Sequence, residues 1–406
     1  MRARRLSAVL ALGVVTSVVI ACGSDSTEPG TEPSPSPTTS TSSTTSPEAG
    51  AKDAASSGDA RADSSSDGSV TSDGSTDAGG DAYVIPPGQP LNVPANTWTY
   101  VPIAGMVCGN GTQTGIAVNP STNPNAPVFF LMMGGGACWD DVTCLGGAAS
   151  NLSDQIDEPE IRADIARFPV LFDRTRADNA FANAHYVFVP YCTGDLHAGN
   201  AQKTYRFLTK SQTIEHRGAR NVEAFLPRVS ATFPGSTKIV LGGGSAGGFG
   251  TMLNYHRFRA AFGSKRIDIL NDSGTPVQPT GSIWSNMQSA WNMTLPASCT
   301  GCTTDARNML PYLATQMGND RFALLSYTQD KTIRAFTGIL IPQQYENAVM
   351  ELRTRLGAKQ KTFYVSGDSH VIIKQDPLPS TAAGLSAATW LQRFANDDPA
   401  WDNAGP

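Results

Sequence analysis

The sequence has little charge, few histidines and no apolar run long enough for a membrane-spanning helix. Charged residues make up 16% of its 406 positions, there are 5 histidines, and the formal net charge is −5. The apolar run Leu6–Ala21 is interrupted by hydroxyl residues and is followed at once by polar sequence. This composition excludes collagen-like, coiled-coil and polytopic membrane proteins.

The negative charge is concentrated in residues 23–82, which contain eleven acidic and two basic side chains. Ser, Thr, Asp, Gly, Ala and Pro dominate this segment, and Val70 is its only large aliphatic residue. It cannot bury enough apolar surface to fold, so we expect a disordered linker. Its Asp-rich part, 67–81, lacks the regular ligand spacing of a calcium site. Residues 83–406 are nearly neutral, which argues against nucleic-acid binding.

The first 22 residues have the pattern of an export signal. Arg2, Arg4 and Arg5 precede the apolar run, which ends in small residues before Cys22. This arrangement is similar to a bacterial lipoprotein signal, in which Cys22 carries the lipid; the alternative is a cleaved signal peptide with an incidental cysteine. Position 23 is Gly rather than the Asp that commonly retains such proteins in the inner membrane. We therefore expect an exported protein, lipid-anchored at the outer membrane or cell surface.

The cysteines fit an oxidising compartment. Apart from Cys22 there are six, an even number that predicts three disulfides. Close spacing indicates two pairs and leaves a third: Cys138–Cys144, Cys299–Cys302 and Cys108–Cys192. The alternative for Cys299 and Cys302 is half of a zinc site. No second Cys/His pair has matching spacing, so we expect no metal.

Residues 83–406 alternate between apolar runs of strand length and segments with helical spacing. Continuous apolar runs suit strands that are buried on both faces of a sheet. Strands are expected at 100–103, 115–118, 128–133, 186–190, 238–241, 267–270, 322–326 and 362–365, and helices at 220–229, 247–258, 344–356 and 383–394. The alternation predicts one α/β domain with a mostly parallel central sheet and helices on both faces. The Trp and Met residues of 277–311 indicate either a helical cap or ordinary core.

The segment Gly243-Gly-Ser-Ala-Gly247 fits the G-x-S-x-G pattern and lies between an expected strand and an expected helix. A sharp turn there would project Ser245 above the sheet as a nucleophile. The alternative is a purely structural glycine turn. In α/β hydrolases the acid and then the histidine follow the serine along the chain. His370 follows the last expected strand, whereas His256 lies in the expected helix after Ser245.

Three carboxylates are candidates for the acid that orients His370. Asp330 follows the strand immediately before the histidine's strand, Asp272 follows the strand before that, and Asp368 lies in the histidine's own loop. Asp330 is preferred by position. For the developing oxyanion, the backbone N–H groups of the Gly134–Gly136 segment and of Ala246 are the expected donors, with Gly135 and Gly136 foremost. A phosphate-binding loop would need a G-x-x-x-x-G-K-[ST] pattern, which this segment lacks.

Several segments together resemble motifs of the pectin acetylesterase/Notum family. They are Phe129-Phe-Leu-Met-Met-Gly-Gly-Gly-Ala-Cys-Trp139 with Cys144, Tyr191-Cys-Thr-Gly-Asp195, Arg217-Gly218, Gly244-Ser-Ala-Gly-Gly248 and Asp272-Ser-Gly274. The resemblance implies an α/β-hydrolase-like esterase with Ser245, Asp330 and His370 as its triad. The chain departs from the eukaryotic members at Gly135-Gly-Ala137 and at Thr328-Gln-Asp-Lys331. Those departures leave the triad intact, but they do not allow the pectin or lipid substrate of the family's members to be assigned to this chain.

We expect an exported serine carboxylesterase that removes acetyl or other short acyl groups from a pectin-like polysaccharide or a small ester. No cofactor is expected, and the protein is expected to be a monomer with no nucleic-acid partner. Two alternatives remain: a non-catalytic surface-binding lipoprotein on a hydrolase fold, and a lipase, lipid deacylase or serine peptidase. A base, an acid and oxyanion donors together favour the enzyme.

Overall fold

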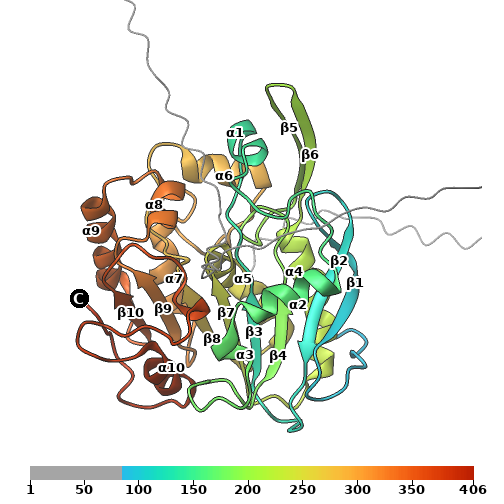
Figure 1. Cartoon of the computed structure of the whole chain (residues 1–406), viewed down its shortest axis with the longest axis vertical. Coiled ribbons are helices and arrows are strands. Elements are labelled where there is room, and N and C mark those ends of the chain that lie inside the picture. The colour runs from blue at the N-terminus through green and yellow to red at the C-terminus, as the bar shows by residue number, and fades with distance from the viewer. Residues whose placement is uncertain (1–84) are drawn as a thin grey trace, which may run out of the picture. The chain divides into compact units, whose positions relative to one another are not determined.

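The computed structural model describes residues 85–406, which form one large sheet and a separate hairpin (Figure 1). The expected signal at 1–22, the lipid-bearing Cys22 and the expected linker at 23–82 lie outside the described residues. The strands are β1 Thr99–Val107, β2 Gln113–Asn119, β3 Val128–Met132, β4 His185–Val189, β5 Ala201–Phe207, β6 Lys210–His216, β7 Lys238–Gly244, β8 Arg266–Asp272, β9 Phe322–Tyr327 and β10 Gln360–Val365.

The main sheet has the order β1-β2-β4-β3-β7-β8-β9-β10. Its first two pairings, β1 with β2 and β2 with β4, are antiparallel, and all later pairings are parallel. Each of the eight strands expected from the sequence corresponds to one strand of this sheet. Because parallel strands end at a common edge, the loops after β3, β7, β8, β9 and β10 meet there.

The helices are α1 Asp141–Leu145, α2 Glu158–Ala166, α3 Pro169–Phe172, α4 Gly218–Thr232, α5 Ala246–Phe262, α6 Ile283–Trp291, α7 Met309–Gln316, α8 Lys331–Thr337, α9 Pro342–Leu352 and α10 Ala387–Ala395. The four helical patterns read from the sequence correspond to α4, α5, α9 and α10. No helix in residues 85–406 combines the length and the apolar composition needed to cross a membrane.

Helices cover both faces of the sheet, as two consecutive residues of β3 demonstrate. Side chains alternate between faces along a strand. The ring of Phe129 contacts Phe172 of α3, whereas the ring of Phe130 contacts Phe258 of α5. In Figure 1, α3 and α10 accordingly lie in front of the sheet and α5 behind it. The expectation of an α/β fold with a mostly parallel sheet is confirmed.

The β5–β6 hairpin, which was not predicted, projects from the body at the top of Figure 1. Half of its strand residues are exposed, and it has no apolar run that would have marked it in the sequence. Three of its residues are buried, Tyr205, Ile214 and His216, and the first two pack with Cys138 and Cys144. The hairpin therefore covers the chain segment that follows the three glycines after β3.

Candidate active site

Ser245 occupies the turn between β7 and α5 with φ 57° and ψ −123°. A positive φ is uncommon for a residue other than glycine and costs about 1–3 kcal/mol, so surrounding contacts must impose it. The Ser245 N–H donates to the carbonyl oxygen of Asp272 at 2.8 Å. A Cβ at position 247 would collide with the carbonyl of Met132, which explains why glycine stands there. The turn has the form expected of a nucleophile elbow.

Asp330 and His370 are brought together by the loops after β9 and β10. The Nδ1–H of His370 donates to Oδ2 of Asp330 at 2.7 Å. The other oxygen, Oδ1, accepts from the backbone N–H groups of Thr332 and Ile333 at 2.9 and 3.0 Å and so caps α8. Asp330 is fully buried, whereas the His370 side chain is 20% exposed. The carboxylate is therefore fixed, and the ring's other nitrogen is left for a reacting group.

The segments that carry Ser245 and His370 pack against each other. A Cβ on Gly244 would lie 3.2 Å from Cγ1 of Val371, so the immediate neighbours of both residues are in contact. Among the described residues no hydrogen bond joins Ser245 to the imidazole. Hydrogen bonds of this kind are often long in unliganded enzymes and shorten when substrate binds.

The structure does not pair the other candidate acids, Asp272 and Asp368, with the His370 ring. It does not pair His256, the other candidate base, with a candidate acid. Oδ2 of Asp272 accepts from the backbone N–H of Ile373 at 2.7 Å, and burial raises the pKa of this carboxyl to about 7. Asp368 is exposed, and its backbone carbonyl accepts from the N–H of Lys331. His256 lies in α5, where burial lowers its pKa to about 3. Of the three carboxylates, Asp330 is the one that contacts the His370 ring.

The glycines after β3 lie against the Ser245 turn. A Cβ on Gly134 would be 2.7 Å from Cβ of Ser245, so a side chain there would displace the serine. Gly136 and Ala246 both line the cavity that contains Ser245. The N–H of Ala246, the first residue of α5, has no acceptor within its own helix. Such donors contribute about 2.7–4 kcal/mol each to stabilising an oxyanion.

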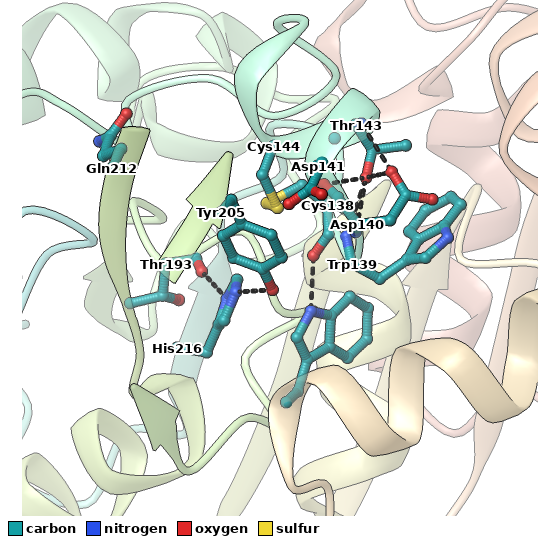
Figure 2. The surroundings of a disulfide bond; sticks show 12 residues. Cys138, Trp139, Asp140, Asp141, Thr143, Cys144, Thr193, Tyr205, Gln212 and His216 are labelled. Carbon is teal, nitrogen blue, oxygen red and sulfur yellow. Dashed lines mark hydrogen bonds between the residues drawn. A yellow bond between two sulfur atoms is a disulfide. The ribbon is translucent and has the colours of Figure 1, made fainter. Parts of the chain in front are cut away.

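Three disulfides join the six cysteines in the pairing expected from spacing: Cys108–Cys192, Cys138–Cys144 and Cys299–Cys302. Cys138 follows the glycines by two residues, and its carbonyl accepts from the indole N–H of Trp291 at 2.6 Å. Figure 2 shows Tyr205 and His216 beside this disulfide. The Tyr205 hydroxyl donates to Nε2 of His216 at 2.8 Å.

Cys138, Cys144 and His216 bring three potential metal-ligand atoms within 4.8 Å of one another. The two sulfur atoms are joined in a disulfide, so they are not the thiolates that a metal requires. Both ring nitrogens of His216 are also engaged, Nε2 by the Tyr205 hydroxyl and Nδ1 by the carbonyl of Thr193, each at 2.8 Å. We interpret the cluster as a support for the glycine segment rather than as a metal site.

The structure adds supporting residues whose roles the sequence motifs did not reveal. Oδ2 of Asp195 accepts from the backbone N–H of Gly218 at 2.7 Å, which joins two motifs that are separate in the sequence. The Tyr191 hydroxyl donates to the carbonyl of Gly136 at 3.0 Å. The Nε2–H of His197 donates to the carbonyl of Met133 at 2.8 Å. The contacts of Tyr191 and His197 hold the two ends of the glycine segment.

A largely apolar cavity opens beside Ser245. Its walls include Leu196, Met252, Trp284, Met287, Met309 and Phe336. Among the lining residues only Ser245 and Thr337 carry a hydroxyl group, and none carries a charge. The Thr337 hydroxyl is already used, because it donates to the carbonyl of Ile333 at 2.8 Å. The cavity therefore offers an apolar group a binding surface next to the serine.

Comparison with known protein families identifies the family of this chain. The family model described as pectinacetylesterase matches residues 93–344, more than half of the chain. The chain belongs to the pectinacetylesterase family. Within the family match lie Ser245 and Asp330, whereas His370 lies beyond its end.

Individual relatives of this pectinacetylesterase family member include two curated carboxylesterases. Palmitoleoyl-protein carboxylesterase notum2 of Xenopus laevis is 29% identical over 161 residues, which is 38% of this chain and 30% of the relative. Palmitoleoyl-protein carboxylesterase NOTUM of Schmidtea mediterranea is 24% identical over 155 residues, 37% of this chain and 28% of the relative. The match thus spans less than a third of either relative.

Among solved structures, the Wnt deacylase Notum from Drosophila matches in two crystal forms. The first has a TM-score of 0.55 and 17% identity, and the match covers 74% of this family member and 93% of that chain. The second has a TM-score of 0.53 and 16% identity, with the same coverage. At this level of identity the likeness shows a common fold.

Proposed function

We propose that the protein is a serine carboxylesterase in which Ser245 is the nucleophile, His370 the general base and Asp330 the acid that orients the imidazole. The hydrogen bond of 2.7 Å between His370 and Asp330, at the sheet edge that also carries the Ser245 turn, is the observation that carries this proposal. A purely binding protein would have no need for a strained serine beside such a pair.

The proposed reaction proceeds through an acyl-enzyme. Ser245 Oγ attacks the ester carbonyl carbon while its proton moves to Nε2 of His370. Asp330 accepts the Nδ1–H bond and stabilises the imidazolium. Backbone N–H groups of Gly135, Gly136 and Ala246 hold the oxyanion, and its collapse expels the alcohol, which takes the proton from His370. Water then attacks the acyl-enzyme by the same route and releases the carboxylic acid and the free serine.

We propose acetyl or other short acyl groups on a carbohydrate polymer as the natural substrate class. The name of the family supports an acetylated polysaccharide. The nearly neutral body of the protein would approach an anionic polymer without strong repulsion. The apolar cavity favours a second candidate, an ester with a longer acyl chain, because each buried methylene contributes about 0.8 kcal/mol.

A chain-length series distinguishes the two candidates. With p-nitrophenyl acetate, butyrate, octanoate and palmitate, the short-acyl proposal predicts the highest kcat/KM for acetate or butyrate, whereas a cavity that binds the acyl chain predicts an optimum at octanoate or beyond. Acetylated pectin and xylan, assayed for released acetate, test the polymer directly. A preference for long chains with no acetate release would remove the polysaccharide proposal and leave the serine mechanism.

A substitution in the cavity wall tests whether the cavity holds the acyl chain. Met287→Trp fills space beside Ser245 and should lower the octanoate-to-acetate ratio of kcat/KM about tenfold. The matched control is Ser285→Trp, which places the same side chain on the exposed side of α6 and should leave the ratio unchanged. An equal change in both variants would show that the cavity does not select the acyl group.

We also propose that Cys22 carries lipid and anchors the exported protein at the outer membrane or cell surface, where it acts as a monomer. The sequence around Cys22 supports this proposal, and the paired cysteines of the folded part fit export. Labelled palmitate should be incorporated into the full chain and not into Cys22→Ser. Equal labelling of both, or of neither, would contradict the anchor.

A further inference from the structure

Three residues with left-handed backbone meet near the proposed nucleophile and base. They are Ser245 with φ 57°, Ser273 with φ 59° and Val371 with φ 61°. This conformation is unusual for serine and an outlier for a β-branched valine. It persists only where surrounding contacts impose it, and such residues cluster at functional sites. Val371 directly follows His370, so the strain lies on both sides of the reacting groups.

The contacts that impose these conformations converge on Asp272 and Ser273. The carbonyl of Asp272 accepts from the N–H of Ser245 at 2.8 Å, and its Oδ2 accepts from the N–H of Ile373 at 2.7 Å. The Ser273 hydroxyl donates to Oδ1 of Asp272 at 3.0 Å and accepts from the N–H of Val371 at 3.2 Å. One residue thus connects the Ser245 turn to the segment after His370.

We infer that Asp272 is a positioning residue that sets the separation between Ser245 and His370 by bonding to the backbone on both sides. The inference rests on the proposed serine esterase function. Asp330 holds the imidazole at Nδ1 and fixes the orientation of the ring. It does not hold the backbone of the histidine's loop. Asp272 and Ser273 do so, through the N–H groups of Ile373 and Val371.

A carboxylate does this better than a neutral group. Hydrogen bonds from a backbone N–H to an ionised acceptor are shorter and about twice as strong as neutral ones. Asp272 and Ser273 are fully buried, so water does not compete for these N–H groups. The side chain of Asp272 has both oxygens engaged, one by Ile373 and one by Ser273.

Protonation of Asp272 should loosen this connection. Burial raises its pKa to about 7, and the charged or titratable groups that act on it are His370 and Asp330. The charge of Asp272 also interacts electrostatically with Tyr327 of the neighbouring strand. As the pH falls below about 7 the carboxylate is lost, the bond to Ile373 becomes a neutral one, and the efficiency should fall. A group that only fills space would add no such titration.

The test compares Asp272→Asn with Asp268→Asn, a matched control in which a buried aspartate of the same strand, paired with Arg266, is replaced at the opposite end of β8. Two readouts are measured between pH 6 and pH 8.5. The first is kcat and KM for p-nitrophenyl acetate. The second is the rate at which a fluorophosphonate labels the nucleophile, forming a bond from serine oxygen to phosphorus with loss of fluoride.

Asp272→Asn should lower kcat and the labelling rate about tenfold, with KM within threefold of the wild type. The ratio of kcat/KM at pH 8 to that at pH 6 should be smaller than in the wild type, because asparagine does not titrate. Asp268→Asn should label within twofold of the wild type. Wild-type labelling and an unchanged pH profile in Asp272→Asn, or equal losses in both variants, would overturn the inference.

Ser273→Gly keeps the test decisive if Asp272→Asn does not fold. Glycine adopts the positive φ of this position freely, and the substitution removes the acceptor for Val371 while Asp272 remains. It should lower the labelling rate several-fold, and an unchanged rate would overturn the inference. Ser245→Ala tests the proposed nucleophile separately from Asp272. If that variant is still labelled, the proposed nucleophile is wrong. If its labelling is lost, the positioning role of Asp272 is the one claim that the other variants test.

Discussion

Ser245→Ala is expected to lower kcat for ester hydrolysis by about 10⁶-fold while the protein remains folded. The chemical step requires the hydroxyl, and the described residues show no hydrogen bond from it that the fold would lose. The strained backbone is held by the N–H bond to Asp272, which alanine keeps. Steady-state kinetics with circular dichroism and Tm check both parts.

His370→Ala should be about as severe as Ser245→Ala, and the double variant should lose little more, because members of a triad act as a unit. Ser285→Ala, an exposed serine of α6, is the control for a lost hydroxyl. A folded Ser245→Ala protein with undiminished turnover would show that another residue is the nucleophile.

Asp330→Asn is expected to lower kcat by up to about 10⁴-fold with little loss of stability. The asparagine Oδ1 can still cap α8 through the N–H groups of Thr332 and Ile333. Its amide nitrogen would then face Nδ1 of His370, where a donor replaces the acceptor and favours the wrong tautomer of the ring. The measured kcat should therefore fall while the Tm stays close to that of the wild type.

Two comparisons distinguish the orienting role of Asp330 from its role as a helix cap and from the role of Asp272. Asp330→Ala removes the helix cap as well and should cost about 1 kcal/mol more in free energy of unfolding than Asp330→Asn. Asp272→Asn should lower kcat much less than Asp330→Asn, since Asp272 bonds to backbone rather than to the ring. The reverse order of the two aspartates would assign the orienting role to Asp272.

The sheet could be predicted from the sequence because its strands are buried on both faces. Segments such as Val128–Met132 and Phe322–Tyr327 are buried at every position, and so they appear as continuous apolar runs. The β5–β6 hairpin escaped prediction for the opposite reason, since half of its strand residues are exposed and few are buried. The short helices α1 and α3 have too few residues to establish a period.

The candidate site was only partly predictable, because chain position does not determine where a side chain points. Asp272 is the last residue of β8 and Asp330 follows β9, and the two strands end at the same sheet edge. In the structure one turns toward the backbone of Ile373 and the other toward the His370 ring. The cavity was harder still to predict from the sequence, because its walls come from separated elements such as α5, α6 and α8.

The order of the proposed triad along the chain has a consequence for biosynthesis. Ser245 follows a central strand, whereas Asp330 and His370 follow β9 and β10, and β10 is bordered on its outer edge by a bridge from Phe363 to Ala404. Chains are synthesised from the N-terminus, and a domain generally folds as a unit. A growing polypeptide therefore holds a serine without its base until the final segments join the sheet. With the proposed triad, we therefore expect a nascent chain to hydrolyse no ester before β10 has joined the sheet.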